Sequence, residues 1–236
     1  RSKILLQRLP YVESVESETT PVEGSPDLVD VDFDIEEGLP GQFGGSLGFS
    51  ETFGVTLGGN FVHSNFMGTG RRVALDLRGG KYQTVYDVNF TDPYRNIDGV
   101  ARTLSLTYQD ITQFTSVTSD FSTTTFSAGI NWGYPITEYQ GLRFGFAYQD
   151  AELVTSVYSS QQALQWVQQN GNPFQVSDSV FGTQVQSLEI ITGWSYDSRN
   201  ATLFPTSGTR LSMSLNAAVP GSEVEYYVAG LNFQKY

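Results

Sequence analysis

The sequence predicts an all-β fold: an antiparallel transmembrane β-barrel segment of about ten strands, preceded by a short α/β region. Three observations lead to this class. Apolar and polar residues alternate in segment after segment from Gln42 onward, the segments are roughly ten residues long, and Tyr and Trp gather near their ends. The mean hydropathy of −0.23 fits such a barrel, because lipid-facing and lumen-facing residues alternate and their hydropathies cancel.

The first 37 residues differ in character from the rest. They carry ten acidic and three basic residues of a chain whose net charge is −12. Apolar residues at helical spacing predict a short amphipathic helix over residues 2–9, which Pro10 ends. Alternation predicts a strand over Leu28–Ile35, with Asp30, Asp32 and Asp34 on its wet face. A calcium loop beginning at Asp30 is rejected, because Ile35 and Gly41 stand where such a loop needs Gly and Glu.

The remaining residues contain eight regular alternating segments, and 42–50 and 54–66 are two less regular ones. The regular segments are 73–77, 84–90, 103–109, 126–134, 142–149, 188–197, 210–217 and 227–234. Leu104, Leu106, Ile130, Trp132, Phe144 and Phe146 are predicted to face lipid. The girdle aromatics are Tyr94, Trp132, Tyr134, Tyr139, Trp194 and Tyr196. We expect one continuous antiparallel meander with a free strand edge, so that residues 42–50 do not pair with 224–236.

Connections are expected to alternate in length. Those near 109–122 and 150–180 look long, whereas the turn near 135–140 looks short. In the second long connection, glutamines surround Leu164, Trp166 and Val167, which favours a short helical or irregular extracellular loop over a transmembrane strand.

The composition argues against several classes of function. A strongly acidic chain lacks the basic surface that nucleic acid requires, and without Cys there is no thiolate ligand for zinc or an Fe–S cluster. The single His63 cannot supply a Ser-His-Asp or His-rich metal site and is interpreted as an interfacial or lumen residue. Gly79-Gly80-Lys81 lacks the flanking residues of a phosphate-binding loop and reads as a hairpin tip. We expect no enzyme, no cofactor and no metal.

Several motifs resemble the BamA family, the outer-membrane β-barrel assembly factors. They are Gly41 to Ser50 for the first barrel strand, Asn65-Phe66-Met67-Gly68-Thr69-Gly70 and Thr91-Asp92-Pro93-Tyr94 for two periplasmic turns, Tyr134-Pro135-Ile136-Thr137-Glu138-Tyr139, and Phe204-Pro205-Thr206-Ser207-Gly208. They follow the family order over most of 41–236. Arg8-Leu9-Pro10-Tyr11 and Gly24-Ser25-Pro26 look like the end of the last periplasmic POTRA domain.

The resemblance implies a domain division and a role. Residues 1–37 would be the C-terminal part of a POTRA-like domain in the periplasm, and 38–236 the first ten or so strands of a barrel in the bacterial outer membrane. The family barrel has more strands, and its surface loop with an Arg-Gly-Phe signature has no counterpart here, so the sequence is expected to be part of a longer polypeptide. The implied partners are unfolded outer-membrane client proteins, accessory lipoproteins and outer-membrane lipid, with no nucleic acid.

The implied site is the first barrel strand, whose edge would template an incoming client strand at a weak lateral gate. Its residues are Gln42, Phe43, Gly44, Gly45, Ser46, Leu47, Gly48, Phe49 and Ser50. Three glycines weaken packing and register in this strand, although they would equally relieve crowding at a bend of the barrel. Two alternatives stay open: a passive pore or two-partner-secretion-type transporter of the same superfamily, and a soluble β-sandwich binding module.

Overall fold

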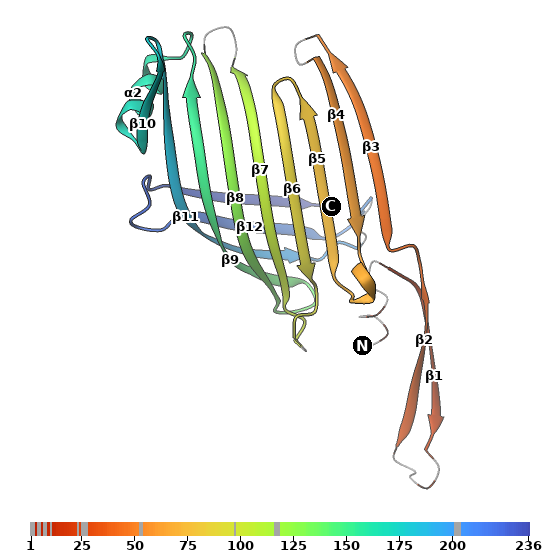
Figure 1. Ribbon diagram of the computed structural model, residues 1–236. Helices are drawn as coiled ribbons and strands as arrows, with labels where there is room; N and C mark the ends of the chain where they lie inside the picture. The colour runs from red at the N-terminus through yellow and green to blue at the C-terminus, as the bar shows by residue number, and fades with distance from the viewer. Residues whose placement is uncertain are drawn as a thin grey trace.

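A computed structural model shows a small hairpin joined to a large curled sheet (Figure 1). It describes residues 11–22, 28–51, 54–96, 98–115, 119–200 and 204–236, together with residues 3, 6, 9 and 24. The helix expected over residues 2–9 therefore falls mostly outside the described residues. Strands β1 (Val12–Pro21) and β2 (Val29–Glu37) pair antiparallel, which includes the strand expected at Leu28–Ile35.

The large sheet is an antiparallel meander. Its strands are β3 (Gly41–Ser50), β4 (Gly54–His63), β5 (Arg72–Gly80), β6 (Gln83–Asp92), β7 (Ala101–Thr115), β8 (Ser119–Pro135), β9 (Gln140–Thr155), β10 (Asn172–Ser177), β11 (Val180–Asp197), β12 (Thr209–Ala218) and β13 (Tyr227–Lys235). Ten of them form one path from β3 to β13, and β10 pairs with β11 beside it. The expected ten strands are thus confirmed. As expected, the sheet is open, with β3 and β13 at its two edges.

Two connections differ from expectation. The prediction of a long loop near 109–122 is wrong, because β7 and β8 pair without interruption from Ala101↔Gly133 to Thr115↔Ser119. The segment 150–180 holds the expected helix, α2 (Gln161–Gln169), but also strand β10, and β9 continues to Thr155. The short turns at 136–139 and at Lys81–Tyr82 are confirmed, and a 3-10 turn, η1 (Phe66–Gly68), follows β4.

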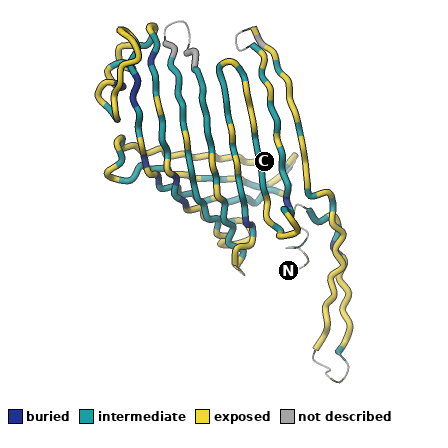
Figure 2. The backbone as a smooth tube through the Cα atoms, in the orientation of Figure 1, coloured by how far each residue is buried: buried dark blue, intermediate teal, exposed yellow. Residues whose placement is uncertain are grey.

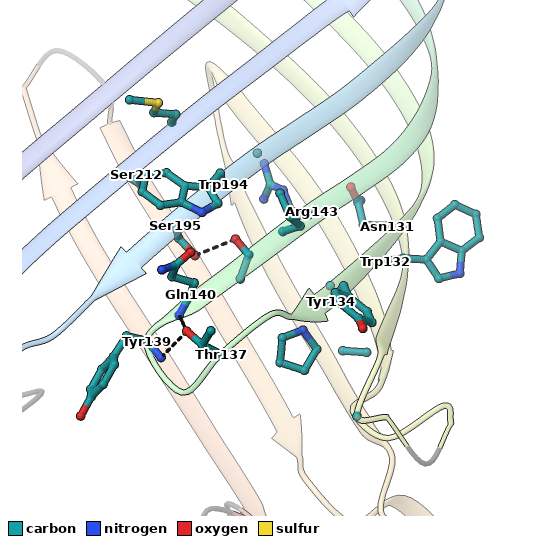
Figure 3. A pocket seen from close by; sticks show the side chains of 18 of the residues that line it. Asn131, Trp132, Tyr134, Thr137, Tyr139, Gln140, Arg143, Trp194, Ser195 and Ser212 are labelled. Carbon is teal, nitrogen blue, oxygen red and sulfur yellow. Dashed lines mark hydrogen bonds between the residues drawn. The ribbon is translucent and has the colours of Figure 1, made fainter.

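Apolar side chains lie mainly on the outside of this sheet. Only Val15, Ala147 and Val167 are buried hydrophobic residues among those described. We call the face carrying Leu104, Leu106, Phe126 and Phe144 the outward face; these four side chains are 40–46% exposed. The inward face carries Asn131, Arg143 and Ser195 and lines the concave side (Figure 3). The sheet thus turns its apolar face to its surroundings, which is the pattern of a lipid-facing barrel wall.

Strand lengths define how far the wall extends. Strands β3 to β6 have 9 or 10 residues, while β7, β8, β9 and β11 have 15, 17, 16 and 18. About ten residues suffice to cross a bilayer, so the extra residues stand beyond it. There the outward face becomes polar: Gln184 Nε2 donates to both carboxylate oxygens of Asp150 at 2.9 and 3.0 Å. No helix among the described residues has the length and apolar character that a bilayer span requires.

Candidate functional site

The predicted site residues, Gln42 to Ser50, all lie on β3, an edge strand of the large sheet (Figure 1). On one side β3 pairs residue for residue with β4, from Gly41↔His63 to Ser50↔Gly54. On the other side it has no strand partner among the described residues. An antiparallel edge directs alternate N–H and C=O groups outward, so β3 offers a row of free backbone donors and acceptors as long as a membrane-crossing strand.

Alternation sorts the site residues between two faces. Phe43, Leu47 and Phe49 lie on the outward face and are 85%, 76% and 76% exposed. Gln42, Gly44, Ser46 and Gly48 occupy the alternating positions, on the inward face. A strand that paired with the free edge would therefore meet an apolar row on one face and a small, polar row on the other.

The glycines of β3 do different things. A Cβ at Gly48 would lie 2.7 Å from Thr56 Oγ1, and one at Gly44 would overlap the Asn60 carboxamide. These two glycines therefore make room for longer side chains on β4. Gly45 differs, because it faces Gly59 across the pair and a Cβ on it would meet nothing closer than Gly58 O at 3.8 Å. The Gly45↔Gly59 pair leaves a gap in the outward face between the Phe43↔Phe61 and Leu47↔Leu57 pairs.

A short joint connects β3 to the hairpin. Gly38 N donates to Tyr11 O at 3.0 Å, and Ser64 N, at the end of β4, donates to Pro40 O at 2.7 Å. The Tyr11 side chain reaches Gly70, where a Cβ would lie 3.3 Å from the Tyr11 hydroxyl. Burial raises the pKa of the Tyr11 phenol, and the nearby Glu37 and Tyr94 raise it further. The base of the hairpin is thus packed against the first turn of the barrel.

The hairpin itself is highly exposed (Figure 2). One face pairs Val15 with Ile35 and Thr19 with Val31, while the other sets acids directly opposite each other, as in Glu16↔Asp34 and Glu18↔Asp32. Like charges in such positions destabilise a pair of strands. The hairpin therefore gains little stability from its own cross-strand contacts.

The inward face is hollowed near the ends of β8, β9, β11 and β12, forming a cavity of about 820 Å³ (Figure 3). Its lining mixes polar residues, among them Asn131, Arg143, Ser195 and Ser212, with apolar ones such as Leu142, Trp194 and Met213. Within the described part of the chain there is no group of three or more His, Asp or Glu that could hold a metal ion. The hollow has the character of a barrel lumen, and its side chains form no arrangement typical of a catalytic site.

One further prediction and one ion pair concern residues at the same end of the sheet. His63 lies on the outward face at the end of β4, with its ring 6.2 Å from Phe61 and 6.1 Å from Phe66, so it is interfacial. Asp197 and Arg199, which follow one another closely at the end of β11, form an ion pair with 2.7 Å between Arg199 Nη2 and Asp197 Oδ2.

The sequence motifs did not indicate β4 as part of the site. Asn60 and Gly59 shape the two faces of β3, yet only the register of the hairpin brings them opposite Gly44 and Gly45. In the sequence, only the closeness of the two strands along the chain indicates that β4 lies beside β3 and that its residues contribute to the site.

An open, strongly curled antiparallel sheet with an apolar outward face and polar side chains on its inward face defines the wall of an outer-membrane-type β-barrel. Comparison with known proteins gives the family: residues 65–236 match the Omp85 superfamily domain, and the chain belongs to this superfamily. It is accordingly an outer-membrane protein.

Three relatives carry more specific names. The chain is 28% identical over 238 residues to the outer membrane protein assembly factor BamA of Neisseria meningitidis serogroup B, and this match covers 98% of this chain and 29% of that protein. It is 23% identical over 146 residues to the outer membrane protein assembly factor BamA of Buchnera aphidicola, and this match covers 62% of this chain and 24% of that protein. The crystal structure of BamA from Haemophilus ducreyi lacking POTRA domains 1–3 matches with a TM-score of 0.76 at 25% identity, over 98% of this chain and 44% of that one. The chain thus spans less than half the length of each relative.

Proposed function

We propose that this chain forms part of an outer-membrane protein assembly factor, which folds client β-barrel proteins and inserts them into the membrane. The observation that carries the proposal is the construction of β3, residues 42–50: an edge strand of the described sheet, long enough to cross a bilayer, whose pairing with β4 is left without side chains at Gly45↔Gly59. Similarity to proteins named BamA over 98% of the chain supports the same role. No step of this mechanism requires side-chain acid–base chemistry, so we propose that the protein is not an enzyme in the usual sense.

The proposed mechanism is strand addition at an edge. Unpaired backbone N–H and C=O groups are costly in hydrocarbon, at several kcal/mol each. A client strand that pairs with β3 satisfies both its own groups and those of the edge, so the edge lowers the cost of bringing a strand into the membrane. Exposed Phe43, Leu47 and Phe49 place the new pair with its apolar side toward lipid.

A weak first strand suits repeated use, because a client must leave after it has folded. Gly45 and Gly59 face each other without side chains, so the middle of the β3–β4 pair lacks cross-strand side-chain contact on its outward face. We propose that this gap keeps β3 easily displaced, and that β3 acts as the lateral gate.

The proposed partners follow from the same role. They are unfolded outer-membrane clients at β3, outer-membrane lipid along the outward face, and accessory lipoproteins of the assembly machinery. We propose that residues 1–37 are the C-terminal part of a POTRA-like domain in the periplasm and that 38–236 are barrel strands.

A passive pore, or a secretion-type transporter of the same superfamily, is the second candidate. The hollow of about 820 Å³ on the inward face, with Asn131 and Arg143 among its lining residues, favours it. Ion conductance in planar bilayers, without any effect on the assembly of other barrels, would distinguish this function from the first.

The test uses the full-length protein and a client stalled during assembly. Ser46 and Ser105 are both serines on the inward face, the first at the β3 edge and the second inside the sheet on β7. We expect Ser46→Cys to form a disulfide with a cysteine in the last strand of the client, and Ser105→Cys to form none. Equal crosslinking at both positions, or none at Ser46 while the client is still inserted, would contradict the proposal.

A further inference from the structure

Four charged residues meet where β5, β6 and β7 reach the hairpin-bearing end of the sheet (Figure 1). Arg71 Nε lies 3.8 Å from Asp92 Oδ2, and Arg95 Nη1 lies 4.0 Å from the same oxygen. Arg102 stands directly opposite Asp92 in the β6–β7 register. The Asp92 side chain is only 11% exposed. Two guanidinium groups therefore lie within 4.0 Å of one carboxylate, and a third arginine stands beside it on the next strand. This arginine cluster has excess positive charge; the exposed Asp98 is the other acid of the connecting loop.

The cluster lies on the outward face. Arg102 alternates with Leu104 and Leu106, and its partner on β8 is Trp132, whose indole points to the opposite side of the sheet from Asn131 (Figure 3). The Arg71 guanidinium sits 5.9 Å from the ring centre of Phe90, an outward residue. The charges therefore face the surroundings of the barrel and not its lumen.

The neighbouring rows of side chains are apolar. Directly next to the cluster, the register aligns Val73, Phe90, Leu104 and Ile130 across four strands. The next two rows are Leu75, Val88, Leu106 and Ala128, and then Leu77, Tyr86, Tyr108 and Phe126. Rows on one face repeat about every 6.6 Å along a strand, so three rows reach through roughly the 15 Å of one leaflet. A cationic row thus borders an apolar surface one leaflet deep.

One donor in the cluster lacks a partner. Arg102 Nε is shielded from solvent and makes no hydrogen bond within the described parts of the chain. A shielded guanidinium N–H normally has an acceptor, because a buried donor without a hydrogen bond costs free energy. Since this nitrogen is covered, an anion from outside the chain would meet the exposed guanidinium groups of Arg71 and Arg95 first.

We propose that Arg71, Arg95 and Arg102 bind the headgroup phosphate of an anionic phospholipid in the periplasmic leaflet, with the acyl chains lying along the apolar rows of β5 to β8. Guanidinium groups are suited to phosphate, since their N–H donors match its oxygens. Trp132 and the half-exposed Tyr94 flank the headgroup level, where amphipathic rings are favoured. The site lies apart from β3, so it is independent of the client-binding proposal.

The test measures lipid selectivity of the full-length protein in phosphatidylcholine vesicles, by electron paramagnetic resonance of spin-labelled phosphatidylglycerol against spin-labelled phosphatidylcholine. We expect the wild type to prefer phosphatidylglycerol and the Arg71→Gln, Arg102→Gln double variant to lose the preference, by about fivefold for each arginine removed. The control is Arg210→Gln, which removes one positive charge, as Arg71→Gln alone does, but from the inward face of β12. It should keep the preference.

Arg71 lies outside the strands and is 44% exposed, so Arg71→Gln alone provides a variant that folds if the double variant does not. It should show about half of the effect on a logarithmic scale. An unchanged preference in the Arg71→Gln and double variants would overturn the proposal, as would an equal loss in Arg210→Gln, which would indicate a general charge effect. Displacement of the lipid by inorganic phosphate at matched ionic strength would reassign the cluster to a free anion and also contradict it.

Discussion

The carboxylate of Glu223 accepts a hydrogen bond from the backbone N–H of Gln186, with 2.6 Å between Glu223 Oε2 and Gln186 N. This contact lies where β11 changes partners. Along one edge of β11, residues up to Gln184 pair with β10, and residues from Glu189 onward pair with β12. Residues 185–188 between them have no strand partner on that edge. Glu223 N donates to Gln186 O at 3.2 Å, and Asn172 Nδ2 donates to Glu223 Oε1. Glu223 thus holds Gln186 and links it to the start of β10, while Ser222 Oγ accepts from Leu188 N at 3.3 Å on the same edge.

The first prediction follows from this contact. Glu223→Ala should leave the barrel folded but expose the amide of Gln186, because its acceptor is lost at a cost of about 1 kcal/mol in local opening. Hydrogen exchange should be faster at Gln186 in the variant. Glu225→Ala, in the same loop, is the control and should exchange like the wild type. Equal protection of Gln186 in all three proteins would show that the carboxylate does not hold this edge.

The strands inside the membrane could be predicted from the sequence, and the extensions beyond it could not. Period-two alternation is visible only where one face meets lipid and the other meets water. Beyond residue 109, β7 and β8 are rich in Ser and Thr on both faces, so the contrast disappears although the strands continue. The six residues of β10 are too few for a period to be recognised.

The candidate sites show the same limit in another form. Residues 42–50 were recognised by their similarity to a known first strand, whereas no local pattern in them shows that the edge is free. Arg71, Asp92, Arg95 and Arg102 are spread over three elements, and only strand register brings them together. Sequence alternation gives the face of each residue but not its neighbour on the next strand.

The second prediction concerns the two faces of β7. Leu106→Arg should destabilise the folded protein by about 2–4 kcal/mol, because it places a charge at mid-membrane on the outward face. Ser105→Arg, one residue earlier, faces inward opposite Gly129 and should be mild. Urea unfolding from lipid vesicles measures both. Equal tolerance of the two substitutions would mean that the faces are assigned the wrong way round.

The third prediction separates the glycines of β3. Gly44→Val should lower stability by about 1–3 kcal/mol, because the new side chain collides with Asn60. Gly45→Val should raise it by less than about 1 kcal/mol, since Val favours strands and meets open space. The temperature at which the full-length barrel unfolds in detergent reports both changes. If weakness of β3 matters for client release, Gly45→Val should also slow client assembly. Unfolding temperatures that move in the same direction would contradict the distinction between the two positions.

The last prediction concerns the side of the membrane on which the segment between β9 and β11 lies. From residue 144 to 198 the sequence contains no Lys or Arg, so trypsin cannot cut this segment, whereas chymotrypsin can cut at Tyr158, which is 67% exposed. Chymotrypsin added to intact cells should therefore cleave after Tyr158, because the segment extends beyond the outer surface. Tyr139, 52% exposed in the turn at the opposite end of β9, should be cut only after the outer membrane is permeabilised. Cleavage at Tyr139 in intact cells, with Tyr158 protected, would reverse the orientation and would move the arginine cluster to the outer leaflet.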